Sequence, residues 1–150
     1  MPKILRDKKQ KLECIRKAVV NAKEHILAGD PRRVYSQYIR YALDEIRNEY
    51  FYVSKKARGL SKNEIIQEHV VPHSIILDKL IALKSVTANK ISNILDRYYA
   101  ICEITKDENQ ELDKKGLRSK MPKGWKDIGL DDRFARYDHV GIKYSKKGEF

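Results

Sequence analysis

The stretch that decides the fold is Glu64-Ile-Ile-Gln-Glu-His-Val-Val-Pro72, close to the middle of the chain. It is short, rich in β-branched residues and stopped by a proline, a pattern that predicts a β-strand ending before Pro72. Successive side chains of a strand point to opposite faces, so Glu68 and His69 are expected on opposite sides of a sheet. A carboxylate and an imidazole at one strand end can therefore serve different roles around one site.

Beyond this strand the pattern predicts three helices and a second strand. Thr105 and Glu108 have the spacing of a capping box, which begins a helix that Gly116 ends, and Thr87 is the expected N-cap of the helix before it. The expected elements are helices over residues 74–84 and 88–97, a strand over 98–105 and a helix over 105–115. From Leu117 onwards we expect loops and one short helix.

Before this strand the sequence predicts two long helices joined by a short turn. Apolar residues recur every three or four positions from Asp7 to Ala28, which indicates one buried helix face. Asp30 is the expected N-cap of the second helix, with Pro31 at its first position, and this helix is expected to run to about Ala57. Residues 1–60 therefore form a helical hairpin, and residues 61–150 form a second domain with a basic C-terminal extension.

The charge is strongly positive and unevenly distributed. The 150 residues contain 32 Lys and Arg against 21 Asp and Glu, giving a net charge of +11. Residues 1–60 carry +8 and residues 114–150 carry +6, whereas residues 61–113 carry −3. Two basic flanks around an acidic middle suit a protein that holds phosphates and collects a metal ion between them. A solvated basic surface without one partner is the alternative.

Several classes of function are disfavoured. The chain lacks a phosphate-binding glycine loop, and its two cysteines, Cys14 and Cys102, cannot form a disulfide framework or a metal knuckle. Pro72 lies between His69 and His73 and prevents the helix that would align them as a zinc pair. No apolar run is long enough to span a bilayer or to serve as a signal peptide. The sequence therefore predicts a soluble, cytoplasmic protein without a membrane partner.

The segment Glu-His-Val-Val-Pro-His-Ser-Ile-Ile-Leu resembles the opening motif of the HNH, or ββα-metal, nucleases, in which an acid and a histidine precede two apolar residues and a proline. The resemblance covers residues 62–116 and includes Asp107-Glu108-Asn109, where the family has an Asn or His early on the final helix. It implies a mainly helical α+β fold: an N-terminal helical hairpin, then an HNH-like core with a helical insertion between its two strands.

The resemblance also implies roles for individual residues. His69 would be the general base that activates water. Glu68 and Asn109 would hold a divalent metal ion, Mg²⁺ or Mn²⁺, with Glu108 as a further candidate ligand. The capping box explains Glu108 without any metal, and that interpretation is preferred. Asp113 could add a ligand, and His73 and His139 could contact phosphate.

Candidate nucleic-acid contacts lie in both basic flanks. Three arginines are spaced every seven residues along the second predicted helix and have tyrosines among them, a combination that can follow phosphates and bases. A solvated helix face is the alternative. The candidate residues are Arg33, Arg40 and Arg47, together with Lys114, Lys115 and Arg118 in the C-terminal flank.

These observations predict a metal-dependent endonuclease that hydrolyses phosphodiester bonds, with DNA as the expected substrate. The alternative is a basic binding protein without catalysis, which binds nucleic acid or inhibits a protein–nucleic-acid complex. The N-terminal helices are also candidates for forming a homodimer or contacting a protein partner.

Overall fold

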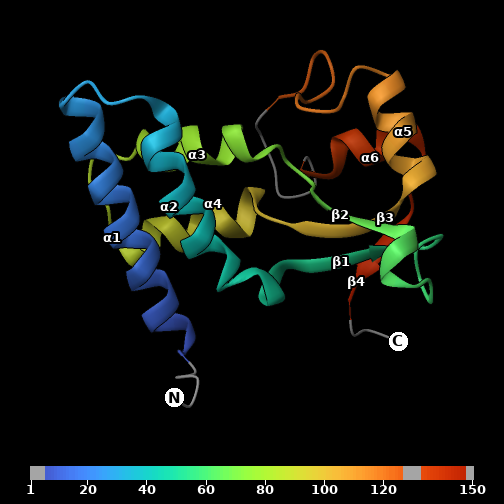
Figure 1. Ribbon diagram of the computed structural model, residues 1–150, viewed down its shortest axis with the longest axis horizontal. Helices are drawn as coiled ribbons and strands as arrows, with labels where there is room; N and C mark the ends of the chain where they lie inside the picture. The colour runs from blue at the N-terminus through green and yellow to red at the C-terminus, as the bar shows by residue number, and fades with distance from the viewer. Residues whose placement is uncertain (1–5, 127–132, 148–150) are drawn as a thin grey trace.

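The fold is α+β, with six helices and a small mixed sheet in the part of the chain that the computed structural model describes, residues 6–126 and 133–147 (Figure 1). The helices are α1 (Lys8–Leu27), α2 (Arg32–Asp44), α3 (His73–Ile81), α4 (Ala88–Tyr98), α5 (Lys106–Lys114) and α6 (Ala135–Val140). Short 3₁₀ turns are η1 (Arg47–Tyr50) and η2 (Lys62–Glu64). The strands are β1 (Phe51–Ser54), β2 (Ile65–His69), β3 (Ile101–Thr105) and β4 (Tyr144–Lys146).

The sheet has the strand order β2-β3-β1-β4. β2 pairs with β3 in antiparallel fashion, with His69 opposite Ile101 and Ile65 opposite Thr105. β1 pairs with β3 in parallel and with β4 in antiparallel fashion. β2 is therefore an edge strand, and one flank of Glu68 and His69 is left open to loops and solvent.

Two apolar cores hold the layers together. One lies among α1 to α4 and includes Ile15, Ile39, Leu80 and Leu95. The other lies between the sheet and the pair α5 and α6, around Cys102 and Leu112. Figure 1 shows α1 to α4 gathered at one end of the molecule, while α5 and α6 lie on one side of the sheet. The end of β2 lies where these two parts meet.

The second helix is shorter than predicted. α2 ends at Asp44, and the chain continues through η1 into β1, where a helix to Ala57 was expected. Residues 50–53 read Tyr-Phe-Tyr-Val, and aromatic and β-branched residues favour strands. Because β1 lies between β3 and β4, the segment expected as a helical hairpin also supplies an interior strand of the sheet.

The start of α2 also differs from the prediction. Pro31 is its N-cap residue and no side chain caps it, although Asp30 was expected there. The carboxylate of Asp30 instead lies 2.7 Å from Nδ1 of His25, at the end of α1. The other predicted caps are confirmed, because Thr87 accepts from the backbone N–H of Lys90 and Thr105 forms a capping box with Glu108.

None of the helices in the described ranges is both long and apolar enough to cross a membrane.

Candidate functional site

β2 ends with Glu68 and His69 on opposite faces of the sheet, as the alternation of a strand predicts. Val70 still donates to the carbonyl of Ala100 at 2.9 Å, and Pro72 then serves as the N-cap residue of α3. The carboxylate and the imidazole therefore meet different neighbours, which we describe in turn.

Glu68 faces α6, where two side chains bind its carboxylate. Nη1 of Arg136 lies 2.5 Å from Oε1, and the hydroxyl of Tyr137 donates to Oε2 at 2.5 Å. Arg136 is only 1% exposed. Burial raises the pKa of Glu68, while the Arg136 charge and the Tyr137 hydroxyl oppose that rise. Both carboxylate oxygens of Glu68 are thus occupied by protein groups.

Arg136 also joins two distant segments of the chain. Its Nη1 donates to the carbonyls of His69 at 2.9 Å and Val70 at 3.0 Å. Its Nε donates to the carbonyl of Leu117 at 2.7 Å, and its Nη2 to that of Arg118 at 3.3 Å. The planar guanidinium therefore holds the end of β2 beside residues 117–118, which follow α5.

His69 faces the helical end of the molecule and lies beside His73. The centroids of the two imidazole rings are 5.5 Å apart, although Pro72 separates the residues in sequence. Burial lowers the pKa of His69, and the nearby Arg40 lowers it further. Burial and the charge of Arg40 also lower the pKa of His73 to about 4. Both rings are therefore predominantly neutral at pH 7, and His69 can accept a proton.

These side chains line a pocket of about 330 Å³ that we call the His69 hollow. Its lining residues are Arg40, Gln67, Glu68, His69, Pro72, His73, Ser74, Arg118 and Ser119. The first turn of α3 forms part of its wall, and no side chain caps that helix. Uncapped N–H groups at a helix N-terminus favour anions, and arginine binds phosphate through paired N–H groups. The hollow therefore has the chemistry of a phosphate site.

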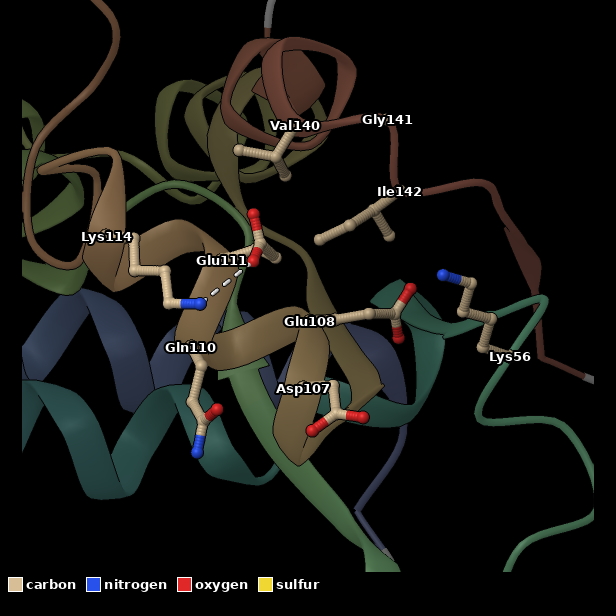
Figure 2. A pocket seen from close by; sticks show the side chains of 9 residues that line it. All are labelled: Lys56, Asp107, Glu108, Gln110, Glu111, Lys114, Val140, Gly141 and Ile142. Atoms are coloured by element: carbon tan, nitrogen blue, oxygen red, sulfur yellow. Dashed lines mark hydrogen bonds and ion pairs between the residues drawn. The ribbon is translucent and has the colours of Figure 1, made fainter.

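A second polar pocket, the α5 hollow, lies beside α5 and the end of α6 (Figure 2). Asp107, Glu108 and Glu111 line it, together with Lys56 and Lys114. Figure 2 shows the Glu108 side chain pointing from α5 to the side where Lys56 lies, while Lys114 is ion-paired with Glu111 at 3.5 Å. The α5 hollow carries more carboxylates than cations, unlike the His69 hollow.

Glu108 is bound firmly within the protein. Its Oε1 accepts from the hydroxyl of Ser54 at 2.6 Å and from the backbone N–H of Thr105 at 2.9 Å. The backbone N–H of Glu108 in turn donates to the Thr105 hydroxyl at 3.0 Å. The structural role of Glu108 in the capping box, preferred on sequence grounds, is confirmed.

The three predicted metal ligands do not form a joint ligand set in this arrangement. Glu68 lines the His69 hollow, Glu108 lines the α5 hollow, and Asn109 is half-buried on α5 and lines neither. Within residues 6–126 and 133–147, no group of three His, Cys, Asp or Glu side chains is placed to hold a metal ion. Both carboxylate oxygens of Glu68 and Oε1 of Glu108 already have protein partners, and the three residues lie apart, so as placed they do not fit one metal ion.

The arginines that were predicted to contact nucleic acid lie in different parts of the structure. Arg40 and Arg118 both line the His69 hollow, and Arg33 is exposed on α2. Arg47 lies beyond the end of α2, in η1, where it bonds to Gln67 and lies over the ring of Phe51. The three arginines therefore do not share one helix face, because α2 ends before the third.

The remaining candidates lie outside the His69 hollow, except His73. Lys114 lines the α5 hollow, and Lys115 and Asp113 are exposed at the end of α5. His139 lines a separate shallow pocket with Lys123 and Trp125. The interpretations of these residues as nucleic-acid or metal contacts stay predictions.

Sequence reasoning missed Arg136 and Tyr137. Their segment, Arg-Phe-Ala-Arg-Tyr137, shows no strong periodicity, and an arginine is rarely fully buried. The one available signal for such a partner was the place of Glu68 in an apolar strand, because a carboxylate that is buried there needs a cationic partner. Neither the distance along the chain nor the residue types identify which arginine supplies it.

Comparison with models of known protein families, with curated proteins and with solved structures gives no match for this chain.

Proposed function

We propose that this protein binds nucleic acid, and that a backbone phosphate enters the His69 hollow. The observation that carries the proposal is the convergence there of Arg40, Arg118 and the uncapped start of α3. The two arginines come from segments far apart in sequence and both are exposed, so their guanidinium groups remain available to a ligand. The net charge of +11 supports a polyanionic partner.

The pairing of the Glu68 carboxylate supports this assignment, although Asp44 also acts electrostatically on His69. Glu68 lines the hollow, but its charge is balanced by the buried ion pair with Arg136. The two histidines are neutral near pH 7, and a bound phosphate would raise their lowered pKa values, because an anion favours the charged imidazole. Proton uptake on binding is therefore expected as the pH falls below neutral.

The test is the binding of a fluorescent oligonucleotide, followed by anisotropy over a range of salt concentrations. The double variant Arg40→Ala/Arg118→Ala is expected to bind at least tenfold more weakly. The slope of log affinity against log salt concentration is expected to become shallower by about 0.7–0.9 for each phosphate contact that is lost. The matched control, Lys84→Ala/Lys90→Ala, removes two exposed cations outside the hollow and is expected to change affinity less than twofold. Equal effects of the two double variants would refute a phosphate site in the His69 hollow.

A second candidate function is phosphodiester cleavage by an HNH-like core made of β2, β3 and α5. It is supported by the antiparallel pairing of β2 with β3, by α5 following directly, and by the neutral imidazole of His69 at the end of β2. His69 would accept a proton from a water whose oxygen forms the new bond to phosphorus. The bond from phosphorus to the leaving sugar oxygen breaks, and that oxygen takes a proton from solvent. Arg40 and Arg118 would stabilise the developing negative charge.

Cleavage is tested with supercoiled plasmid and Mg²⁺ or Mn²⁺, with and without a chelator. Nicking by the wild-type protein that His69→Ala reduces at least a hundredfold, with binding retained within a few-fold, supports hydrolysis. Binding without nicking in every condition refutes the second candidate and leaves the first intact. A requirement for metal, a cytoplasmic location and a preference for DNA stay predictions.

A further inference from the structure

Two tyrosines on α2 are exposed to solvent, whereas most other tyrosines of the chain are not. Tyr38 is 57% exposed and Tyr41 is 66% exposed, whereas five of the nine tyrosines, among them Tyr35 on the same helix, are buried. Residues three apart lie on one side of a helix, so Tyr38 and Tyr41 form a pair on its outer surface. Exposed aromatic pairs of this kind provide flat faces for stacking.

The pair borders a hollow of about 440 Å³ between α1 and α2, which we call the α1–α2 slot. Ala18 of α1 and Ala42 of α2 lie within it, and their small side chains leave room beside the rings. Asn21 and Lys17 of α1 also line the slot. An aromatic wall, room for a flat group, an amide and a cation together suit a nucleobase attached to a phosphate backbone.

The charge of the slot fits an anionic chain. Glu45 is the acidic residue that lines it, and both its oxygens bind Nη1 of Arg6, at 2.7 and 2.8 Å. Lys17 of α1 lines the slot and is exposed, and the chain as a whole carries a net charge of +11. Two chains of this net charge would repel each other, whereas a polyanion would be attracted. Charge complementarity therefore favours nucleic acid over a second copy of the chain.

The slot and the His69 hollow share α2. Arg40 lines the hollow and the next residue, Tyr41, lines the slot. Adjacent helix residues differ by about 1.5 Å along the axis and by about 100° around it, so these side chains leave α2 at one level in different directions. A strand that crosses α2 here meets a phosphate-binding group on one side and an aromatic group on the other.

From these observations we propose that the α1–α2 slot binds an unpaired nucleobase stacked on Tyr38 and Tyr41, so that the preferred ligand is single-stranded nucleic acid. The proposal rests on the proposed function and adds the class of substrate to it. Bases inside a duplex are stacked on each other and cannot present a face to a tyrosine ring.

The test compares three fluorescent ligands of equal length: a single strand, the same strand in a duplex, and an abasic sugar-phosphate strand. The wild-type protein is expected to bind the single strand at least tenfold more tightly than the other two. Tyr38→Ala/Tyr41→Ala is expected to weaken binding of the single strand tenfold or more and to leave the duplex and abasic strands within twofold. Tyr38→Phe/Tyr41→Phe keeps the aromatic rings and is expected to retain binding within about twofold.

The thiol of Cys14 gives an independent readout, because it lines the slot while Cys102 is fully buried. The single strand at saturation is expected to slow alkylation of Cys14 at least fivefold, and the abasic strand is expected to leave the rate unchanged. Because both tyrosines are exposed, the alanine variant is expected to keep its unfolding temperature within a few degrees.

Three results would overturn the proposal. If the alanine variant binds the single strand as wild type while Arg40→Ala/Arg118→Ala does not, the slot is not used and the proposed function stands. If no ligand binds the wild-type protein, both proposals fail. If sedimentation shows a wild-type dimer that Tyr38→Ala/Tyr41→Ala dissociates, a second copy occupies the slot instead.

Discussion

The His69 hollow and the α5 hollow are both polar, but they differ in charge and in what their charged groups already bind. In the His69 hollow the carboxylate of Glu68 is balanced by Arg136, while Arg40 and Arg118 remain exposed. In the α5 hollow Asp107, Glu108 and Glu111 outnumber the lysines, and Glu108 is bound to Ser54 and Thr105. Under the proposed function, the exposed arginines of the His69 hollow, rather than its acid and histidine motif alone, would make that surface the one that meets a polyanion.

Removal of Arg136 is expected to have the largest effect on stability. Arg136→Met leaves Glu68 buried without its cation and removes four bonds to backbone carbonyls. Removing one partner of a buried ion pair lowers the free energy of unfolding by about 3–5 kcal/mol. Urea denaturation measures the loss, and the exposed Arg33→Met serves as the matched control with an expected change below about 0.5 kcal/mol. Adding Glu68→Gln to Arg136→Met should recover part of the loss. A cost below about 1 kcal/mol for Arg136→Met would show that the pair does not organise the His69 hollow.

The second prediction is a pH dependence confined to the His69 hollow. Binding of an oligonucleotide is expected to strengthen as the pH falls from 7.5 to 5.5, because a bound phosphate raises the lowered pKa values of His69 and His73 and protons are taken up. The gain is at most about one log unit in affinity per pH unit for each proton. The double variant His69→Gln/His73→Gln should flatten the profile. An unchanged profile in that variant would place the titrating groups elsewhere.

The same histidines are expected to make the fold sensitive to acid. The pKa of His73 in the folded state is about 4, below the ordinary histidine value of 6.5 that an unfolded chain approaches. The unfolded state therefore takes up the proton first, so stability is fully present above about pH 6.5 and falls as the pH drops towards 4. Denaturant titrations at several pH values measure this fall. His73→Phe should lose less stability between pH 6.5 and 4.5 than wild type, and an equal loss would contradict the prediction.

In the α5 hollow the expected effects concern the fold alone. Glu108→Ala removes the acceptor for Ser54 and Thr105 and should cost about 1–2 kcal/mol. Glu108→Gln can still complete the capping box and should cost less than about 1 kcal/mol. Neither variant is expected to change affinity for an oligonucleotide by more than twofold. A loss of affinity in Glu108→Gln would show that the α5 hollow, too, takes part in binding.

The smallest effect is expected for the lysines of the α5 hollow. Lys56→Ala/Lys114→Ala removes two cations, as Arg40→Ala/Arg118→Ala does, but from the hollow where carboxylates predominate. Lys114 is a candidate nucleic-acid contact on sequence grounds, but the proposed phosphate site lies in the His69 hollow, so affinity and salt dependence should match those of the wild-type protein. A fall in the salt slope like that of the arginine variant would assign phosphate contacts to both hollows.

The elements with strong local signals could be predicted from the sequence. The apolar spacing of α1, the capping residues Thr87 and Thr105, and the β-branched run of β2 all depend on neighbouring residues. β1 and β4 were not predicted. The aromatic and β-branched residues of β1 favour a strand, but the run is short and the helical spacing of apolar residues continues through it, whereas β4 has three residues and depends on its pairing with a distant strand. The predicted end of α2 was wrong because the residues that follow Asp44 lead into β1, whose pairing is with strands distant in sequence.

The candidate site was predictable in part. His69, Glu68, Arg40 and Arg118 were named from the sequence, and all four line one hollow. Their grouping depends on Arg136, which joins the end of β2 to residues 117–118, and no local pattern reveals a buried arginine of that kind. Glu108 and Asn109 were expected beside Glu68, but the path of α5 takes Glu108 into the other hollow.

The most direct test of the phosphate site uses the four histidines of the chain as reporters in one spectrum. Carbon–proton correlation spectra of the imidazole rings would be followed while a short oligonucleotide is added. The account predicts saturable shifts of His69 and His73, which line the hollow, with His25 and His139 unchanged. Shifts of His139 or His25 with His69 and His73 unmoved at saturation would contradict it.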